Sequence, residues 1–248
     1  FPTRRSSDLH TCGLKVDGAV DCWGSNIDGQ AADQPGPYLT VSAGFWHSCG
    51  LKADGAVDCW GDNGAGQAAD QPGPYLSVSA GVYHSCGLKA DGAVDCWGDN
   101  DNGQATVPAE MSAAGSAGFG QIAAGNAHAC QVNRDGTLAC WGNNDEGQAT
   151  PPAGVFTQVV AGDSHSCAIG TNSKVTCWGR NGAMNTTQLA SATGIWWQLA
   201  PGPNGAICAL AFNRMSVLCV GGGWVSTDPF IARQITHNQD SGNAPVSC

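Results

Sequence analysis

Short runs of apolar and small residues alternate with polar, glycine-containing turns along this chain, and the alternation is periodic. The clearest unit spans residues 47–67 and reads HSCGLKADGAVDCWGDNGAGQ. Related copies occupy residues 10–30, 84–104, 128–148, 165–182 and 207–221. The second cysteines of successive copies are 37, 37, 44, 37 and 42 residues apart. A regular spacing of about 40 residues predicts a repeat architecture.

Each unit has the pattern of a β-hairpin. Residues 48–52 and 56–60 are strand-like runs joined by Ala53-Asp54-Gly55, a loop whose glycine can adopt the left-handed conformation of a bulged hairpin. If the residues that flank this loop pair with each other, Cys49 lies directly across from Cys59. Opposed β-carbons of paired strands are close enough for a disulfide. The sequence therefore predicts a hairpin that is cross-linked to itself.

Two further strands complete the predicted unit. Residues 39–43 (LTVSA) have the pattern of a strand that ends at Gly44, and residues 66–69 of a short fourth strand. Four antiparallel strands per repeat, many copies and no helical periodicity are typical of propeller blades. We therefore predict an all-β fold, a β-propeller of four-stranded antiparallel blades with six repeats visible. In the complete protein we expect seven blades, because Cys248 falls 40 residues after Cys208 and can begin another unit.

The domain organisation follows from the extent of the repeats. Residues 1–9 (FPTRRSSDL) do not fit the repeat, and their spelling looks like the translation of a sequencing adaptor, so we exclude them from the fold. Residues 10–248 form one propeller domain, which we expect to be truncated at both ends. Residues 109–120 lengthen one connection, and their small side chains predict a surface loop. Residues 230–236 can supply another strand.

The number and spacing of the cysteines indicate where the protein is located. Of 13 cysteines, twelve form pairs separated by 10 or 11 residues, which indicates disulfides and an extracellular or cell-surface location. Metal binding is the alternative, but these separations lack the short CxxC spacing of zinc sites. Cys248 is left unpaired. The predicted bridges are Cys12–Cys22, Cys49–Cys59, Cys86–Cys96, Cys130–Cys140, Cys167–Cys177 and Cys208–Cys219.

Charge and hydropathy narrow the class of partner. The net charge of −10 disfavours nucleic acid, which is bound chiefly through Lys and Arg, and adhesion to anionic membranes. No apolar run approaches the ~20 residues of a membrane-spanning helix, so we expect no membrane insertion. The acidic balance is most simply explained by solubility. We expect a monomer.

The motif V-S-A-G-x-x-H-S-C-x-L-x-x-D-G-x-V-x-C-W-G-x-N-x-x-G-Q resembles the regulator of chromosome condensation repeat, in a cysteine-bearing bacterial form. The resemblance implies a seven-bladed propeller. Residues 97–110 and 141–154 look most like propeller-type inhibitors of β-lactamases, although the repeats of those inhibitors lack the cysteine pairs. The chain has neither a wedge-like insertion nor a basic face, so nucleotide exchange and chromatin docking are not indicated, and a shared fold does not transfer function.

Several recurring polar residues have both a functional and a structural explanation. In the first five units a histidine stands two residues before the first cysteine, at His10, His47, His84, His128 and His165, and the sixth unit lacks it. Equivalent positions in separate blades cannot converge on one ion, so we expect structural hydrogen bonds. The Asp- and Asn-rich loops at 99–103 and 143–147 lack the bidentate glutamate of a calcium loop and suit a tight turn. We expect the repeated tryptophan to pack between blades.

No catalytic motif is present, so we expect no enzyme and no cofactor. The variable positions inside the constant frame are more informative, because the loop after the first strand and the loop after CWG should emerge on one face. Aromatic residues beside acidic and amide groups are typical of a protein-binding surface, whereas aromatics tucked between blades are the alternative. The candidate binding residues are Phe45, Trp46, Tyr83, Asp62, Asn63, Asp99 and Asn100.

The sequence thus predicts a secreted, non-enzymatic β-propeller that binds a protein partner. Two alternatives remain open. The chain could inhibit a secreted enzyme such as a β-lactamase, or it could be a structural component of the cell surface.

Overall fold

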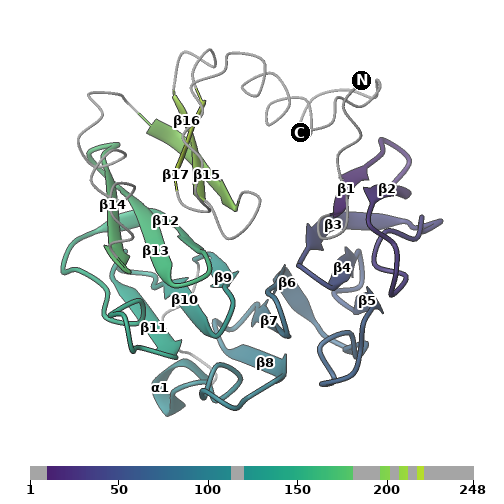
Figure 1. Ribbon diagram of the computed structural model, residues 1–248, viewed down its shortest axis with the longest axis horizontal. Coiled ribbons are helices and arrows are strands. Elements are labelled where there is room, and N and C mark those ends of the chain that lie inside the picture. The colour runs from purple at the N-terminus through teal and green to yellow at the C-terminus, as the bar shows by residue number, and fades with distance from the viewer. Residues whose placement is uncertain (1–9, 113–119, 181–195, 202–206, 212–216, 221–248) are drawn as a thin grey trace.

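The structure is a computed structural model, and it describes residues 10–112, 120–180, 196–201, 207–211 and 217–220. Its strands form separate antiparallel sheets that follow one another along an arc (Figure 1). This confirms the all-β repeat fold. Residues 1–9, residues 230–236 and Cys248 lie outside the described residues. The predictions made for them, and the number of blades in the complete protein, stay predictions.

Each sheet corresponds to one sequence repeat, here called a blade and numbered in chain order. In the described range the first blade has two strands and the other five have three. The strands of blades 1–3 are β1 (His10–Leu14), β2 (Val20–Gly24), β3 (Tyr38–Ala43), β4 (His47–Lys52), β5 (Val57–Gly61), β6 (Tyr75–Ala80), β7 (His84–Lys89) and β8 (Val94–Gly98). Those of blades 4–6 are β9 (Ile122–Ala124), β10 (His128–Val132), β11 (Leu138–Gly142), β12 (Phe156–Ala161), β13 (His165–Gly170), β14 (Val175–Gly179), β15 (Trp196–Pro201), β16 (Ile207–Ala211) and β17 (Val217–Val220).

The hairpin in each blade has the predicted register. In blade 2, Lys52 N donates to Ala56 O over 2.8 Å and Gly55 has φ +85°, so the three-residue loop and its left-handed glycine are confirmed. Cys49 is paired directly with Cys59, and the two are disulfide-bonded. The equivalent bridges in blades 1, 3, 4 and 5 are also present. Cys208 is disulfide-bonded as well and lies opposite Cys219 in the register.

The predicted fourth strand is wrong. Residues 66–69 form part of a turn, and the outer edge of blade 2 gains only an isolated bridge between Val57 and Gln71. The physical reason lies in local hydrogen bonds. Asn63 Oδ1 accepts from Ala68 N over 3.0 Å, which holds the loop closed, and the Asp70 carboxylate accepts the edge N–H of Cys59 over 2.9 Å. A side chain therefore satisfies the donor that a fourth strand would have paired.

The predicted surface loop at 109–120 is wrong in its first residues. Ala109–Ser112 forms the short helix α1, which follows Pro108. Met111 N donates to Pro108 O over 2.8 Å, and the Met111 side chain is buried. Residues 113–119 lie outside the described residues.

Apolar clusters fill the spaces between successive blades. One of them joins Cys49, Leu51 and Val57 of blade 2 to Tyr75 and Ala80 of blade 3. Tyr75 packs flat over Gly87, where an added Cβ would lie 2.6 Å from the ring. A glycine is therefore required on the second strand wherever the first strand starts with tyrosine. The core of this protein is thus a series of interfaces between blades.

Each blade has two ends that set the geometry of the surface. We call one the loop end, which carries residues 44–46 and 62–68 in blade 2, and the other the turn end, which carries the hairpin loop at residues 53–55. Backbone bonds hold like ends of neighbouring blades together. Phe45 N donates to Gly81 O over 3.1 Å at the loop end, and Tyr75 N donates to Gly55 O over 2.8 Å at the turn end.

Candidate functional site

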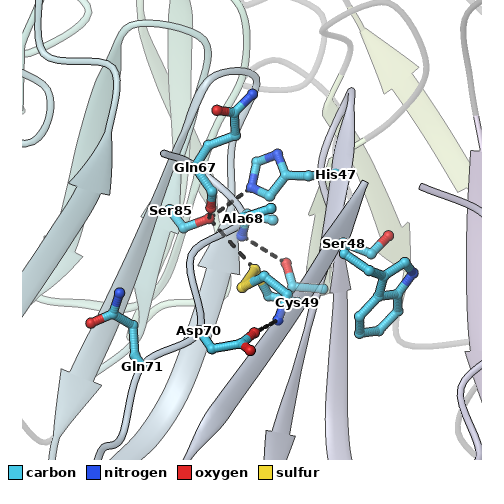
Figure 2. The surroundings of a disulfide bond; sticks show 12 residues. His47, Ser48, Cys49, Gln67, Ala68, Asp70, Gln71 and Ser85 are labelled. Carbon is cyan, nitrogen blue, oxygen red and sulfur yellow. Dashed lines mark hydrogen bonds between the residues drawn. A yellow bond between two sulfur atoms is a disulfide. The ribbon is translucent and has the colours of Figure 1, made fainter. Parts of the chain in front are cut away.

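A hydrogen-bonded cluster around the histidine joins the loop end of blades 1, 2 and 4 to the next blade, and Figure 2 shows the cluster of His47 in blade 2. His47 Nε2 lies 2.7 Å from Ser85 Oγ, and Ser85 Oγ donates to the backbone oxygen of Gln67 over 3.0 Å. The same oxygen accepts from Trp97 Nε1 over 3.1 Å. The cluster links blade 2 to blade 3 through side chains 38 residues apart. The structure confirms the predicted structural hydrogen bond for His10, His47 and His128, and the packing of Trp97 between blades 2 and 3. At His84 and His165 the ring Nε2 has no hydrogen-bond partner, so the prediction is wrong for those two rings.

The cluster determines the protonation state of the histidine. Because the Ser85 hydroxyl donates its hydrogen to Gln67 O, it must accept one from His47, so Nε2 carries the proton. His47 Nδ1 is buried without a hydrogen-bond partner. Burial, together with the neighbouring His84 and His10, lowers the pKa of His47 to about 4, against an opposing effect of Asp62. The ring is neutral at physiological pH.

Equivalent clusters recur, with two exceptions among the described blades. His10 and His128 meet Ser48 and Ser166 at 2.6 and 2.7 Å. His84 Nε2 has no partner, because Ala129 occupies the serine position of blade 4. His165 Nε2 also has none, and Ile207 occupies that position in blade 6. Burial lowers the pKa of His84 to about 4 and that of His128 to about 3.

The structure brings the two predicted binding loops together at the loop end. Asp62 N donates to Trp46 O over 2.9 Å, and Asp99 N donates to Tyr83 O over 2.8 Å. The rings of Phe45 and Trp46 meet edge to face with centroids 4.7 Å apart. Both are half-buried, whereas Tyr83 is 41% exposed. The aromatic side chains are therefore partly packed and partly presented to solvent.

The polar candidates have structural partners of their own. Asp62 accepts from Gly64 N with one oxygen and from Gln67 Nε2, over 2.7 Å, with the other. Asp99 repeats this arrangement with Asp101 N and Gln104 Nε2. These hydrogen bonds fix the shape of both loops.

The two candidate amides shape the same loops. Asn63 and Asn100 use their side-chain oxygens on Ala68 N and Ala105 N, over 3.0 and 2.9 Å. Every polar candidate residue thus stabilises the loop in which it lies.

One exposed loop-end residue was missed by the sequence reasoning. Ile27 of blade 1 is 75% exposed and occupies the position of Gly64 in blade 2. The available signal was a β-branched apolar residue within an otherwise polar and glycine-rich loop. It adds an apolar side chain to the loop-end surface, which we define as Ile27, Phe45, Trp46 and Tyr83 with the acidic loops around them.

Among the described residues, no group of three or more His, Cys, Asp or Glu side chains is arranged to hold a metal ion. The Asp- and Asn-rich loops instead direct their side chains to their own backbone, as with Asn144 Oδ1 and Ala149 N at 2.9 Å. In the described part of the chain, no helix is both long and apolar enough to span a membrane.

Comparison with solved structures gives close matches in fold. The ectodomain of the Physcomitrella patens receptor kinase CR4 is 31% identical, with a TM-score of 0.68 over 88% of this chain. The CRINKLY WD40 ectodomain of the Arabidopsis thaliana receptor kinase ACR4 is 29% identical, with a TM-score of 0.73 over 89% of this chain and 80% of that one. This chain spans 61% of the moss ectodomain, which is less than two thirds of it.

A more distant match shows the fold alone. Prp20p from Saccharomyces cerevisiae is 20% identical, with a TM-score of 0.60 over 75% of this chain and 58% of its own. Comparison with curated proteins gave no match. The family described as "Regulator of chromosome condensation (RCC1) repeat" matches residues 6–30, 39–67, 76–104, 121–148 and 156–183, more than half of the sequence. With one match on each of five successive repeats, this chain belongs to the regulator of chromosome condensation repeat family.

Proposed function

We propose that this chain is a non-enzymatic protein-binding propeller of an extracellular or cell-surface setting, and that its partner binds the loop-end surface. The observation that carries the proposal is the placement of Phe45, Trp46 and Tyr83 at the loop ends of adjacent blades. Aromatic residues concentrate binding energy in protein interfaces, particularly where they are held rigidly. The backbone bond from Phe45 N to Gly81 O ties the two aromatic loops to each other.

The extracellular part of the proposal rests on two independent observations. Five disulfides, one in each of the first five blades, are stable only where the environment is oxidising. The two plant proteins described above are ectodomains of receptor kinases and are 31% and 29% identical to this chain. Fractionation of the producing cells tests the location. Recovery of the protein from the cytoplasm with free thiols would contradict it.

The binding surface can be tested with a pair of matched variants in one blade. Tyr83 at the loop end and Leu76 at the turn end are 41% and 49% exposed, so truncation of either should leave the fold intact. The immobilised chain first captures a partner from the extracellular fluid of the source, and the partner is then purified. We expect Tyr83→Ala and Trp46→Ala to weaken its affinity at least about tenfold, which corresponds to ~1.4 kcal/mol.

The control is Leu76→Ala, which should change the affinity by less than about twofold, because an exposed contact outside the interface contributes little. Circular dichroism and thermal unfolding confirm that each variant folds. Equal loss of affinity from Leu76→Ala, or from changes at Lys52 and Lys89 of the turn end, would place the interface on the other face. An unchanged affinity in Trp46→Ala would refute the proposed surface.

A further inference from the structure

The two faces of the propeller carry different charge. At the turn end, acidic residues are accompanied by all but one of the described basic residues. These are Lys15, Lys52, Lys89, Arg134 and Lys174. The loop end carries Arg180 alone among the described basic residues, and its Nε lies 3.7 Å from Glu146 Oε1. The charge of the described residues is therefore unevenly distributed between the two faces.

In blades 1–3 the turn-end lysine pairs with an aspartate of its own hairpin. Lys15 lies 2.6 Å from Asp21 across its own hairpin, and Lys52 and Lys89 pair with Asp58 and Asp95 in the same way. These pairs are exposed and add little stability. Their consequence is electrostatic, because each lysine locally cancels the charge of one turn-end aspartate.

Acidic side chains of the loop end extend over blades 1–5. They are Asp28, Asp62, Asp99, Asp101, Asp145, Glu146 and Asp163. Two of them are held in fixed positions, since Asp62 and Asp99 each accept a hydrogen bond from a buried glutamine of the same loop. Negative charge fixed in place before binding needs no reorganisation when a cation arrives, so it discriminates strongly between partners of opposite charge.

Backbone hydrogen bonds place two loop-end aromatic residues next to acidic residues. Trp46 O accepts from Asp62 N, and Tyr83 O accepts from Asp99 N, so each aromatic side chain has an acid in the neighbouring loop. A guanidinium or ammonium group is attracted both by the face of a Trp or Tyr ring and by a carboxylate. The aliphatic part of an Arg or Lys side chain also packs well on aromatic rings. An acidic partner would meet like charge without compensation.

Resting on the proposed function, we infer that the partner presents Arg or Lys side chains, next to apolar ones, to the loop-end surface. The apolar contacts are expected at Ile27, Trp46 and Tyr83, and the cations in the acidic loops around them. The lysine and arginine side chains of the turn end offset most of its acidic charge, so that face attracts a cationic partner less strongly.

Three series of short labelled peptides of equal length test the inference. In each series Leu alternates with one other residue, which is Arg, Gln or Glu. Fluorescence anisotropy of the full chain with each series gives the affinity at low and high salt. We expect the Arg series to bind at least about tenfold more tightly than the Gln series at low salt, the Glu series not to bind, and the difference to shrink as salt screens the charges.

Two double variants with the same loss of charge provide the matched control. Asp28→Asn/Asp101→Asn removes exposed charges at the loop end, and Asp54→Asn/Asp91→Asn removes two at the turn end. Asn retains the acceptor oxygen by which Asp54 and Asp91 hold Ala56 N and Ala93 N, so these turns stay intact. The loop-end variant should bind the Arg series about fivefold more weakly, as expected for two exposed charge pairs. The turn-end variant should bind it unchanged.

Equal weakening by the two variants, equal affinity for the Arg and Gln series, or no binding of the Arg series would overturn the inference. These outcomes are distinct from failure of the proposed function. If Trp46→Ala still weakens binding of the purified partner, but the two double variants bind the Arg series equally well, the proposed binding surface stands and the proposal of a cationic partner fails. If Trp46→Ala leaves the purified partner unaffected, the surface itself is wrong.

Discussion

The most direct test of how neighbouring blades are joined is the substitution Ser85→Ala. Ser85 and His47 are fully buried, and the hydroxyl bridges His47 Nε2 and Gln67 O at 2.7 and 3.0 Å. Alanine leaves the Nε2 proton of His47 without an acceptor in a site that water does not reach. A buried donor left unsatisfied costs about 1–3 kcal/mol. We expect the free energy of unfolding to fall by that amount.

Blade 4 allows the reverse substitution, from alanine to serine, to be tested. Ala129 occupies the serine position of blade 4, and Trp141 Nε1 already donates to Gln104 O over 3.0 Å, as Trp97 does to Gln67 O. Ala129→Ser should therefore supply the missing partner of His84 and bond to Gln104 O. Since one net hydrogen bond contributes about 1 kcal/mol, this variant should be more stable than the parent by about that amount.

Urea denaturation at neutral pH with the disulfides intact measures both variants, and hydrogen exchange of β4 and β7 localises the effect. Ser77→Ala is the control, because the Ser77 hydroxyl is buried without a partner. Its removal should be neutral or stabilising. A bridging role for Ser85 is refuted if Ser85→Ala lowers the free energy of unfolding no more than Ser77→Ala. It is also refuted if Ala129→Ser destabilises the chain by the amount that Ser85→Ala does.

Three further perturbations test other parts of the fold. Between pH 6.5 and about 4, the unfolded chain binds a proton at His47 that the folded chain does not bind. The free energy of unfolding should therefore fall as the pH falls through this window, by up to about 1.4 kcal/mol per pH unit for this residue. A urea midpoint that is flat across the window would show that the ring is protonated in the fold. Replacing both Cys49 and Cys59 by Ser should lower the free energy of unfolding by about 2–3 kcal/mol on the chain-entropy model. A non-reduced peptide map in which Cys49 is bonded to a cysteine of another blade would contradict the register. The backbone N–H of Leu199 donates to the side-chain oxygen of Gln158 over 2.7 Å, so Gln158→Ala should speed the hydrogen exchange of that N–H. An unchanged exchange rate would show that this hydrogen bond does not form in solution.

The sequence by itself determined the hairpin, because every element of it is local. The Ala53-Asp54-Gly55 loop sets which residues of the two strands face each other, and the two-residue period of a strand then places Cys49 opposite Cys59. Five near-copies of the pattern make the repeat fold evident before any contact is known. The position of the aromatic residues beside the loops that follow CWG also follows from the up-and-down course of the strands.

Only the tertiary structure decided which polar groups meet. Gly66 to Ala69 has the composition of a short strand, yet the loop closes on Asn63, and Asp70 satisfies the edge of the sheet instead. His47 finds its partner 38 residues away, since each blade completes its hydrogen bonds on the next. The side chains of Asp62 and Asp99 were expected only at a binding surface, and they also hold buried glutamines. Contacts between repeats depend on how blades stack, and the residue pattern within one repeat does not encode that.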